Sequence, residues 1–116
     1  KYFNVECKSY ADFPFHQLLY QGDVRLLDEW IEQLLDVAED NDLNLLILKF
    51  NRKGKYIGFQ ERLLNISMFT HRHVNYKNWI ITGYKDFFKL NQGSVKHLSI
   101  QGIPIAPIVE RPVENE

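Results

Sequence analysis

Cysteine is nearly absent from this chain, and long apolar runs are absent altogether. The one cysteine among 116 residues, Cys7, excludes an internal disulfide framework and is typical of proteins that work in a reducing interior. No cysteines and histidines stand at the spacing of a structural zinc site. The longest apolar run covers only a few residues and no signal peptide is evident, so we expect an intracellular protein, cytoplasmic or nucleoid/nuclear, without a membrane partner.

An initiator methionine is also missing, because the chain starts at Lys1, directly on a predicted strand. We therefore expect a domain taken from a longer polypeptide. A hydrophobic content of 45% and an aromatic content of 14% favour a folded chain over a disordered one. Because Pro104, Pro107 and Pro112 preclude long helices from Asn91 onward, we expect one small domain at residues 1–90 and a C-terminal extension or tail at 91–116.

The net charge is only −1, but the two signs are segregated along the chain. Between Asp23 and Asp42 every charged residue except Arg25 is acidic, whereas between Lys49 and Lys77 every charged residue except Glu61 is basic. A basic face is the electrostatic footprint expected of a protein that acts on nucleic acid. The alternative is that both runs are simply solvated faces.

The first residues alternate between apolar and polar, which predicts a half-buried strand. The predicted apolar face carries a small cysteine that we interpret as buried, and the opposite face is polar. The apolar face comprises Phe3, Val5 and Cys7, and the polar face Asn4, Glu6 and Lys8.

Glu6 and Lys8 place a carboxylate and an ammonium side by side on the polar face of this strand. Divalent-metal phosphodiester chemistry needs such a pair, because the carboxylate holds a hard cation while the ammonium orients the attacking water and offsets phosphate charge. The alternative is a surface ion pair, worth well under ~1 kcal/mol.

The remaining pattern predicts an α/β fold. A helix with Asp23 as its N-cap and an end at Asn41-Asp42 is followed by a buried strand, Leu43–Phe50, and a hairpin that returns as Tyr56–Phe59. Residues 60–73 are ambiguous between a short helix and an insertion. A strand at 79–82 and a short helix at 84–90 complete the order. A strand, crossover helix and strand form a right-handed unit, so the first strand is predicted to lie parallel to Leu43–Phe50.

These elements resemble the second half of the PD-(D/E)XK nuclease superfamily, and most closely archaeal-type Holliday junction resolvases and related phage-encoded nucleases. The resemblance covers about half of the chain and implies a restriction-endonuclease-like mixed sheet flanked by helices, with its N-terminal portion missing. It is carried by Val5-Glu6-Cys7-Lys8-Ser9, by the helix with Leu27, Trp30, Ile31 and Leu34, by the strand ending Leu46-Ile47-Leu48-Lys49-Phe50, and by the hairpin strand Lys55-Tyr56-Ile57-Gly58-Phe59.

The resemblance implies a DNA endonuclease that uses Mg2+ or Mn2+ and acts in recombination or repair, with a preference for branched junctions as one possibility. Glu6 would bind the metal, the backbone carbonyl of Cys7 would complete the coordination, and Lys8 would position the water and stabilise the pentavalent phosphate. Ser9 matches a small hydroxyl residue that contacts phosphate in relatives. Resolvase relatives cut as homodimers, so a C2 homodimer is implied by analogy.

The chain departs from the family pattern at two places. The metal-binding Asp of the family precedes the E-x-K strand; nothing from Lys1 to Val5 replaces it, and Asp12 follows the motif. Relatives also often carry Gln in the helix near the position of Trp30. Either an N-terminal part has been removed, in which case residues 1–116 alone cleave weakly or not at all, or the chain is a non-catalytic nuclease-like domain for DNA or protein binding, or a subunit of a larger assembly.

We expect DNA to contact one face of the protein through its phosphates, around the basic turn that follows the central strand. The alternative is a hairpin tip that is charged only for solubility. The expected face comprises Lys8, Lys49, Arg52, Lys53, Lys55 and Arg72.

Two further groups of residues are less specific. His71 and His73 lack an evident third metal ligand, so a solvated or phosphate-contacting patch is favoured. The aromatic residues after the first strand either stack on unpaired bases or form core and dimer contacts; they are Tyr10, Phe13, Phe15 and Tyr20.

Overall fold

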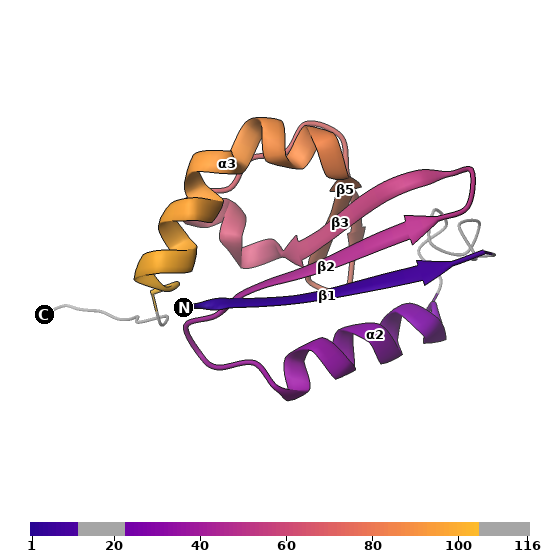
Figure 1. The fold of residues 1–116 in the computed structure, drawn as a ribbon, viewed down its shortest axis with the longest axis horizontal. Coiled ribbons are helices and arrows are strands. Elements are labelled where there is room, and N and C mark those ends of the chain that lie inside the picture. Colours follow the sequence, from indigo (N-terminus) through magenta and orange to yellow (C-terminus); the bar gives the residue numbers. More distant parts are fainter. Residues whose placement is uncertain (12–22, 105–116) are drawn as a thin grey trace, which may run out of the picture.

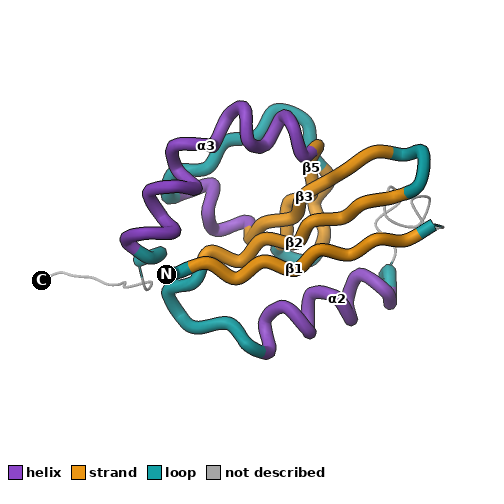
Figure 2. The backbone as a smooth tube through the Cα atoms, in the orientation of Figure 1, coloured by secondary structure: helices purple, strands orange, loops and turns teal. Residues whose placement is uncertain are grey.

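The computed structural model describes residues 1–11 and 23–104 and shows a five-stranded sheet between helices (Figure 1). Helix α2 covers one face of the sheet, and α3 together with a short 3-10 helix, η1, covers the other (Figure 2). The elements are β1 (Phe3–Tyr10), α2 (Arg25–Asp36), β2 (Leu43–Phe50), β3 (Gly54–Gln60), η1 (Glu61–Asn65), β4 (Val74–Tyr76), β5 (Trp79–Gly83) and α3 (Tyr84–Gln101).

The sheet has the order β1-β2-β3-β5-β4 and is mixed. Strands β1 and β2 are parallel and are joined by α2, whereas β2, β3, β5 and β4 pair antiparallel. The predicted parallel pairing and the predicted α/β mixed sheet flanked by helices are therefore confirmed. The register places Glu6 opposite Leu46 and Lys8 opposite Leu48, so the polar residues of β1 lie beside the central strand.

Strand β2 lies at the centre of two hydrophobic clusters, one on each face of the sheet. On the α2 side Leu46 and Leu48 pack with Trp30 and Trp79. On the α3 side Leu43 and Leu45 pack in a second cluster, whose other fully buried members include Ile57, Phe59, Leu63, Ile80 and Phe87. A strand that is apolar on both faces is typical of a sheet covered on both sides, and this explains the uninterrupted Leu and Ile run.

The predicted orientation of β1 is wrong. The apolar residues face outward, with Phe3 46% and Val5 36% exposed and Cys7 also exposed, while Asn4 and Lys8 are half-buried toward α2. The physical reason is that β1 is an edge strand and α3 packs on β2, β3 and β5. Among the described residues, no element covers the apolar face of β1.

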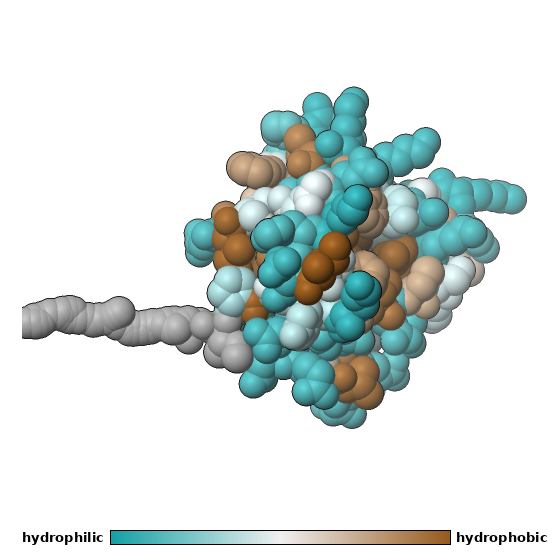
Figure 3. All heavy atoms as spheres, turned by 60° about the vertical axis from the view of Figure 1, so that its left-hand side comes forward, coloured by the Kyte–Doolittle hydropathy of each residue, from teal (hydrophilic) through white to brown (hydrophobic). Residues whose placement is uncertain are grey.

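Exposed hydrophobic residues are visible where the chain's N-terminus comes forward, as brown spheres among teal ones (Figure 3). The large hydrophobic residues that remain exposed include Tyr2, Phe3, Val5 and Ile100. Helix α3 reaches this end of the molecule, because Tyr2 N donates a hydrogen bond to Ser99 O at 3.0 Å. No helix of the described residues is long and apolar enough to cross a membrane.

The end of helix α3 also differs from the prediction. Helix α3 continues to Gln101 instead of ending at Leu90, because the first proline after it, Pro104, lies beyond Gly102, which ends the helix with a φ of 83°. Asn91 is buried inside this helix, and its amide pairs with the backbone N–H and C=O of Phe69 at 2.7 and 2.8 Å. Asn91 therefore holds the loop at Phe69 against the helix.

The start and end of α2 differ as well. Its N-cap is Val24, not Asp23, and its last residue is Asp36. Tyr76 explains the start: its hydroxyl oxygen accepts a hydrogen bond from Val24 N at 2.8 Å, so a distant side chain pairs with a backbone donor at the helix entry. Tyr76 belongs to β4, a three-residue strand that the sequence pattern did not reveal.

Candidate active site

Glu6 and Lys8 lie next to each other on the α2 side of β1. Lys8 Nζ is 3.5 Å from a carboxylate oxygen of Glu6 and donates a hydrogen bond to Gln33 Oε1 on α2 at 2.8 Å. The side chain of Lys8 is 24% exposed and that of Glu6 is 41% exposed. The ammonium is therefore held between a carboxylate and an amide, at an edge of the sheet that solvent reaches.

This arrangement is suited to binding an anion and a cation together. Carboxylate oxygen is a ligand that hard divalent cations prefer, and Glu6 is exposed enough to provide it. Among the described residues Lys8 has one charged partner, Glu6, at a partly exposed site, and such a pair is worth about 1 kcal/mol or less. Separating the two side chains to admit a phosphate or a metal ion would therefore cost little.

Gln33 was not among the residues singled out from the sequence. The resemblance implies a helical Gln near the position of Trp30, and Trp30 itself is a core residue, 7% exposed. Gln33 follows Trp30 by three residues, and residues i and i+3 are neighbours on a helix surface. The sequence feature that could have identified Gln33 is thus a glutamine one helical turn after Trp30, on the side of the helix that faces the E-x-K strand.

A ladder of amides fixes the position of α2 relative to β1. Asn4 Nδ2 donates to Leu34 O at 2.7 Å and to Asn44 Oδ1 at 2.9 Å, and Asn44 Nδ2 donates to Gln60 Oε1 at 3.1 Å. Asn44 is 4% exposed, so an unpaired amide there would be costly. Because Leu34 directly follows Gln33, this ladder also holds the partner of Lys8 in place.

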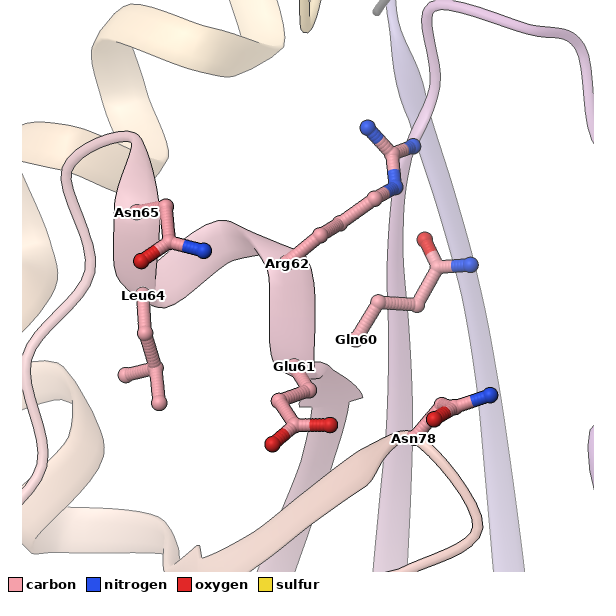
Figure 4. A pocket seen from close by; sticks show the side chains of 6 residues that line it. All are labelled: Gln60, Glu61, Arg62, Leu64, Asn65 and Asn78. Carbon is pink, nitrogen blue, oxygen red and sulfur yellow. The ribbon is translucent and has the colours of Figure 1, made fainter.

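Gln60, the last residue of this amide ladder, borders a hollow of about 530 Å³. In Figure 4 the side chains of Leu64 and Asn65 lie on one side of it and those of Gln60 and Asn78 on the other, with Arg62 pointing away from Glu61. Its lining residues are Gln60, Glu61, Arg62, Leu64, Asn65 and Asn78. Sequence analysis assigned no function to these residues.

A second polar cluster fixes the beginning of α2. The hydroxyl of Tyr76 donates to Asp28 Oδ1 at 2.7 Å, and Lys77 Nζ lies 3.1 Å from Asp28 Oδ2 and 3.3 Å from Asp23 Oδ1. Partial desolvation acts to raise the pKa of Asp28, but the hydrogen bonds from Tyr76 and Lys77 outweigh it and the pKa is lowered. Desolvation, followed by the hydrogen bond to Asp28, raises the pKa of Tyr76, and the hydrogen bond to Asp28 raises that of Lys77.

The single DNA-contacting face expected from the sequence does not form. Side chains alternate along strands, so Lys49, which follows the register partner of Lys8, lies on the α3 side of the sheet. Ser9 and Lys55 are the cross-strand partners of Lys49 and share that side, opposite to Lys8. Arg52 and Lys53 occupy the hairpin turn between β2 and β3, and Arg72 lies in the exposed segment before β4. The fold thus brings Glu6 and Lys8 together and separates Lys8 from Lys49 and Lys55.

Other candidates from the sequence stay apart from this site. His71 and His73 are exposed, and the described residues contain no group of three His, Cys, Asp or Glu side chains able to hold a metal ion. Tyr10 contacts the core residue Trp30 edge-on, with ring centroids 6.0 Å apart. Asp12, Phe13, Phe15 and Tyr20 lie outside the described residues.

The chain matches a known protein family. A family model described as "Phage putative PDDEXK endonuclease" matches residues 1–100. No curated protein and no solved structure matches the chain significantly. The match includes β1, α2, the β2–β3 hairpin and nearly all of α3.

Proposed function

Because this chain belongs to the phage PDDEXK endonuclease family, we propose that it hydrolyses phosphodiester bonds of DNA with the help of a divalent metal ion. The observation that carries the proposal is the placement of Glu6 and Lys8 side by side on β1, with Lys8 bound to Gln33. No other carboxylate–ammonium pair of the described residues combines this strand position with the family motif. The resemblance further predicts that the metal ion is Mg2+ or Mn2+, that the DNA substrate is a branched junction, and that the protein acts as a homodimer.

The residues present fit one part of a metal site. Glu6 supplies a hard oxygen ligand at an exposed position, and the Cys7 carbonyl is the proposed second ligand. Mg2+ is typically held by one or two carboxylates, with water and substrate phosphates filling the other positions. A bound metal ion lowers the pKa of water and polarises the phosphate. The further carboxylate is proposed to come from outside the described residues, in the role that the resemblance gives to the Asp preceding the E-x-K strand.

The chain's own residues have separate tasks in the proposed reaction. Glu6 holds the cation close to the scissile phosphate. Lys8 brings a positive charge to the phosphate oxygens, where negative charge accumulates in the transition state, and orients the attacking water. Gln33 fixes the direction of the Lys8 ammonium through a bond of 2.8 Å. Ser9 points to the other side of the sheet, so the phosphate contact suggested for it by the resemblance would be made on that side.

Cleavage assays on the full-length polypeptide test the proposal. We expect Glu6→Ala and Lys8→Ala each to lower the cleavage rate by at least about 100-fold, because each removes a group that acts on transition-state charge. Binding of DNA should change little, since the two variants retain the other basic residues. Arg25→Ala, which removes an exposed base at the start of α2, is the control.

The outcome separates two functions. Cleavage at the wild-type rate by both variants refutes the assignment of Glu6 and Lys8. If the wild-type polypeptide binds DNA but does not cleave it with either metal, the chain is the non-catalytic nuclease-like domain that the missing family Asp suggests. The observation that favours this second function is that the described residues contain no group of three His, Cys, Asp or Glu side chains able to hold a metal ion.

A further inference from the structure

The surroundings of Glu6 and Lys8 are poorly suited to attract DNA. The outer side of α2 exposes Glu29, Glu32 and Asp36, and the only bases of β1 and α2 are Lys8 and Arg25. DNA carries one phosphate charge per ~1.7 Å of duplex, so an acidic helix beside the pair repels it. The affinity for the substrate must therefore come from another surface of the molecule.

Bases gather on the opposite side of the sheet. The register pairs Lys49 directly with Lys55, and both are exposed on the α3 side. Like charges directly opposite each other across two strands are destabilising. Lys55 Nζ lies 4.5 Å from the ring centroid of Tyr84, the first residue of α3, so the cation is held toward the helix. The pair is thus connected to α3, which adds Lys85 and Lys89.

Two hollows flank Lys89, which lines both of them. One measures about 500 Å³ and the other about 440 Å³. The acid Asp86 lines the first hollow, and it is the only acid on either lining. The first is lined by His71, Arg72, Asp86, Lys89 and Leu90, and the second by Tyr84, Lys85, Phe88, Lys89 and Gln92.

The cations of this surface have no acidic partner among the described residues. The ion pairs of residues 1–11 and 23–104 involve Lys8 or Lys77. We use the name α3 face for the surface formed by Lys49, Lys55, Arg72, Lys85 and Lys89. An unneutralised basic surface with two adjacent hollows is complementary to a polyanion that has evenly spaced charges.

We infer that the α3 face binds the phosphate backbone of DNA and is a second binding surface, separate from Glu6 and Lys8. This inference rests on the proposed function, which makes DNA the polyanion that the protein meets. The sheet lies between the two surfaces, because Glu6 and Lys8 are on its α2 side and the α3 face is on the other (Figure 1). A DNA segment on the α3 face is therefore not the segment that reaches Lys8, and the surface supplies affinity without taking part in the chemistry.

The test compares two charge-matched double variants of the full-length polypeptide. Lys85→Gln/Lys89→Gln removes two bases from the α3 face, and Arg25→Gln/Arg62→Gln removes two exposed bases that lie outside it. Binding of a fluorescent duplex is followed by anisotropy between 50 and 300 mM salt, in EDTA, so that no strand is cut. Circular dichroism confirms that both variants are folded, and the single variants Lys85→Gln and Lys89→Gln provide the comparison if the double variant is not.

We expect the α3-face variant to lose affinity by on the order of tenfold per removed contact at 0.1 M salt. The slope of log K against log salt should become shallower by about 1.8, which is two contacts at about 0.9 each, whereas the control keeps the wild-type slope. Equal slopes for the two double variants overturn the inference. Displacement of the duplex by polyglutamate at equal charge concentration also overturns it, because the surface then prefers acidic polypeptide.

Cleavage distinguishes this inference from the proposed function. At saturating DNA, the α3-face variant should cut at the wild-type rate, because Glu6, Lys8 and Gln33 are unchanged. Loss of cleavage in Glu6→Ala with normal binding supports the proposed function whatever the α3-face variant does. A lower rate at saturation in the α3-face variant shows that the surface belongs to the catalytic site, and overturns the separation inferred above.

Discussion

Replacing Tyr76 by Phe should destabilise the protein, because its hydroxyl joins two residues, Val24 and Asp28, at the start of α2. The hydroxyl accepts from Val24 N at 2.8 Å and donates to Asp28 Oδ1 at 2.7 Å, and both Tyr76 and Val24 are buried, at 4% and 1% exposure. Leaving a buried N–H unpaired costs about 1–3 kcal/mol, and losing a hydrogen bond to a charged group about 1.5–3 kcal/mol. The carboxylate of Asp28 is 39% exposed and keeps Lys77, so we expect the lower part of these ranges, about 2–3 kcal/mol in total.

Urea denaturation measures this change. With a slope of about 1–3 kcal/mol per molar urea, the midpoint of Tyr76→Phe should fall by about 1–2 M without a change in slope. Tyr2→Phe is the control, because Tyr2 is 40% exposed and its hydroxyl makes no hydrogen bond with a described residue. Equal midpoints for the wild type and Tyr76→Phe would refute the reasoning.

The stability lost in Tyr76→Phe should depend on pH. The pKa of Asp28 is lowered in the folded protein, so the ionised carboxylate contributes stability above its ordinary pKa of 3.8, and this contribution is lost as pH falls through the lower folded pKa. Removing the Tyr76 hydroxyl brings the pKa of Asp28 back toward its ordinary value. The difference in midpoint between wild type and Tyr76→Phe should therefore be smaller in strong acid than at pH 7, and the part that remains belongs to Val24 N–H.

Two further variants test the positioning of Lys8 and the end of α3. Gln33→Ala should lower kcat of DNA cleavage by about tenfold with KM and thermal stability nearly unchanged, because it removes one hydrogen bond that orients Lys8; a fall in stability with kcat retained would assign Gln33 a structural role instead. Gly102→Ala should cost about 1–3 kcal/mol in urea denaturation, because Gly102 has a φ of 83° and a ψ of 155°, and an added Cβ would lie 3.1 Å from the ring of Tyr2. The matched control is Gly93→Ala, which meets no atom within 4 Å inside the same helix and should be neutral or stabilising, and an equal loss in both variants would contradict this account.

The charge segregation noted in the sequence has a structural counterpart. Glu29, Glu32 and Asp36 of the acidic run form the exposed side of α2. Of the basic run, Arg52 and Lys53 lie in the hairpin turn, and Lys49, Lys55 and Arg72 lie on the α3 face. A protein with a net charge of −1 thus presents two surfaces of opposite sign on the two sides of one sheet. We expect this division to favour binding of a DNA segment on the α3 face over binding along the exposed side of α2, since the acidic side repels the backbone and the basic side attracts it.

Much of the fold could be predicted from the sequence because its signals are local. The Leu and Ile run identified β2 with its observed bounds, Leu43–Phe50, and the basic turn identified the β2–β3 hairpin. The helical spacing of Leu27, Trp30 and Leu34 identified the buried side of α2. Strand β4 was not predicted because its three residues are too few to show a period. The end of α3 was mispredicted because Pro104, Pro107 and Pro112 lie beyond Gly102, where the helix ends, and so do not limit it from Asn91 onward.

For the candidate site too, some features follow from the sequence alone and others only from the tertiary structure. Alternation along a strand is a property of the backbone, so the sequence by itself determined that Glu6 and Lys8 share one face of β1 and Cys7 the other. Which of these faces is covered was decided only by the tertiary structure, because burial depends on where the helices pack: α3 lies over β2, β3 and β5 and leaves Phe3, Val5 and Cys7 exposed, whereas α2 lies beside Glu6 and Lys8 and brings Gln33 to the ammonium.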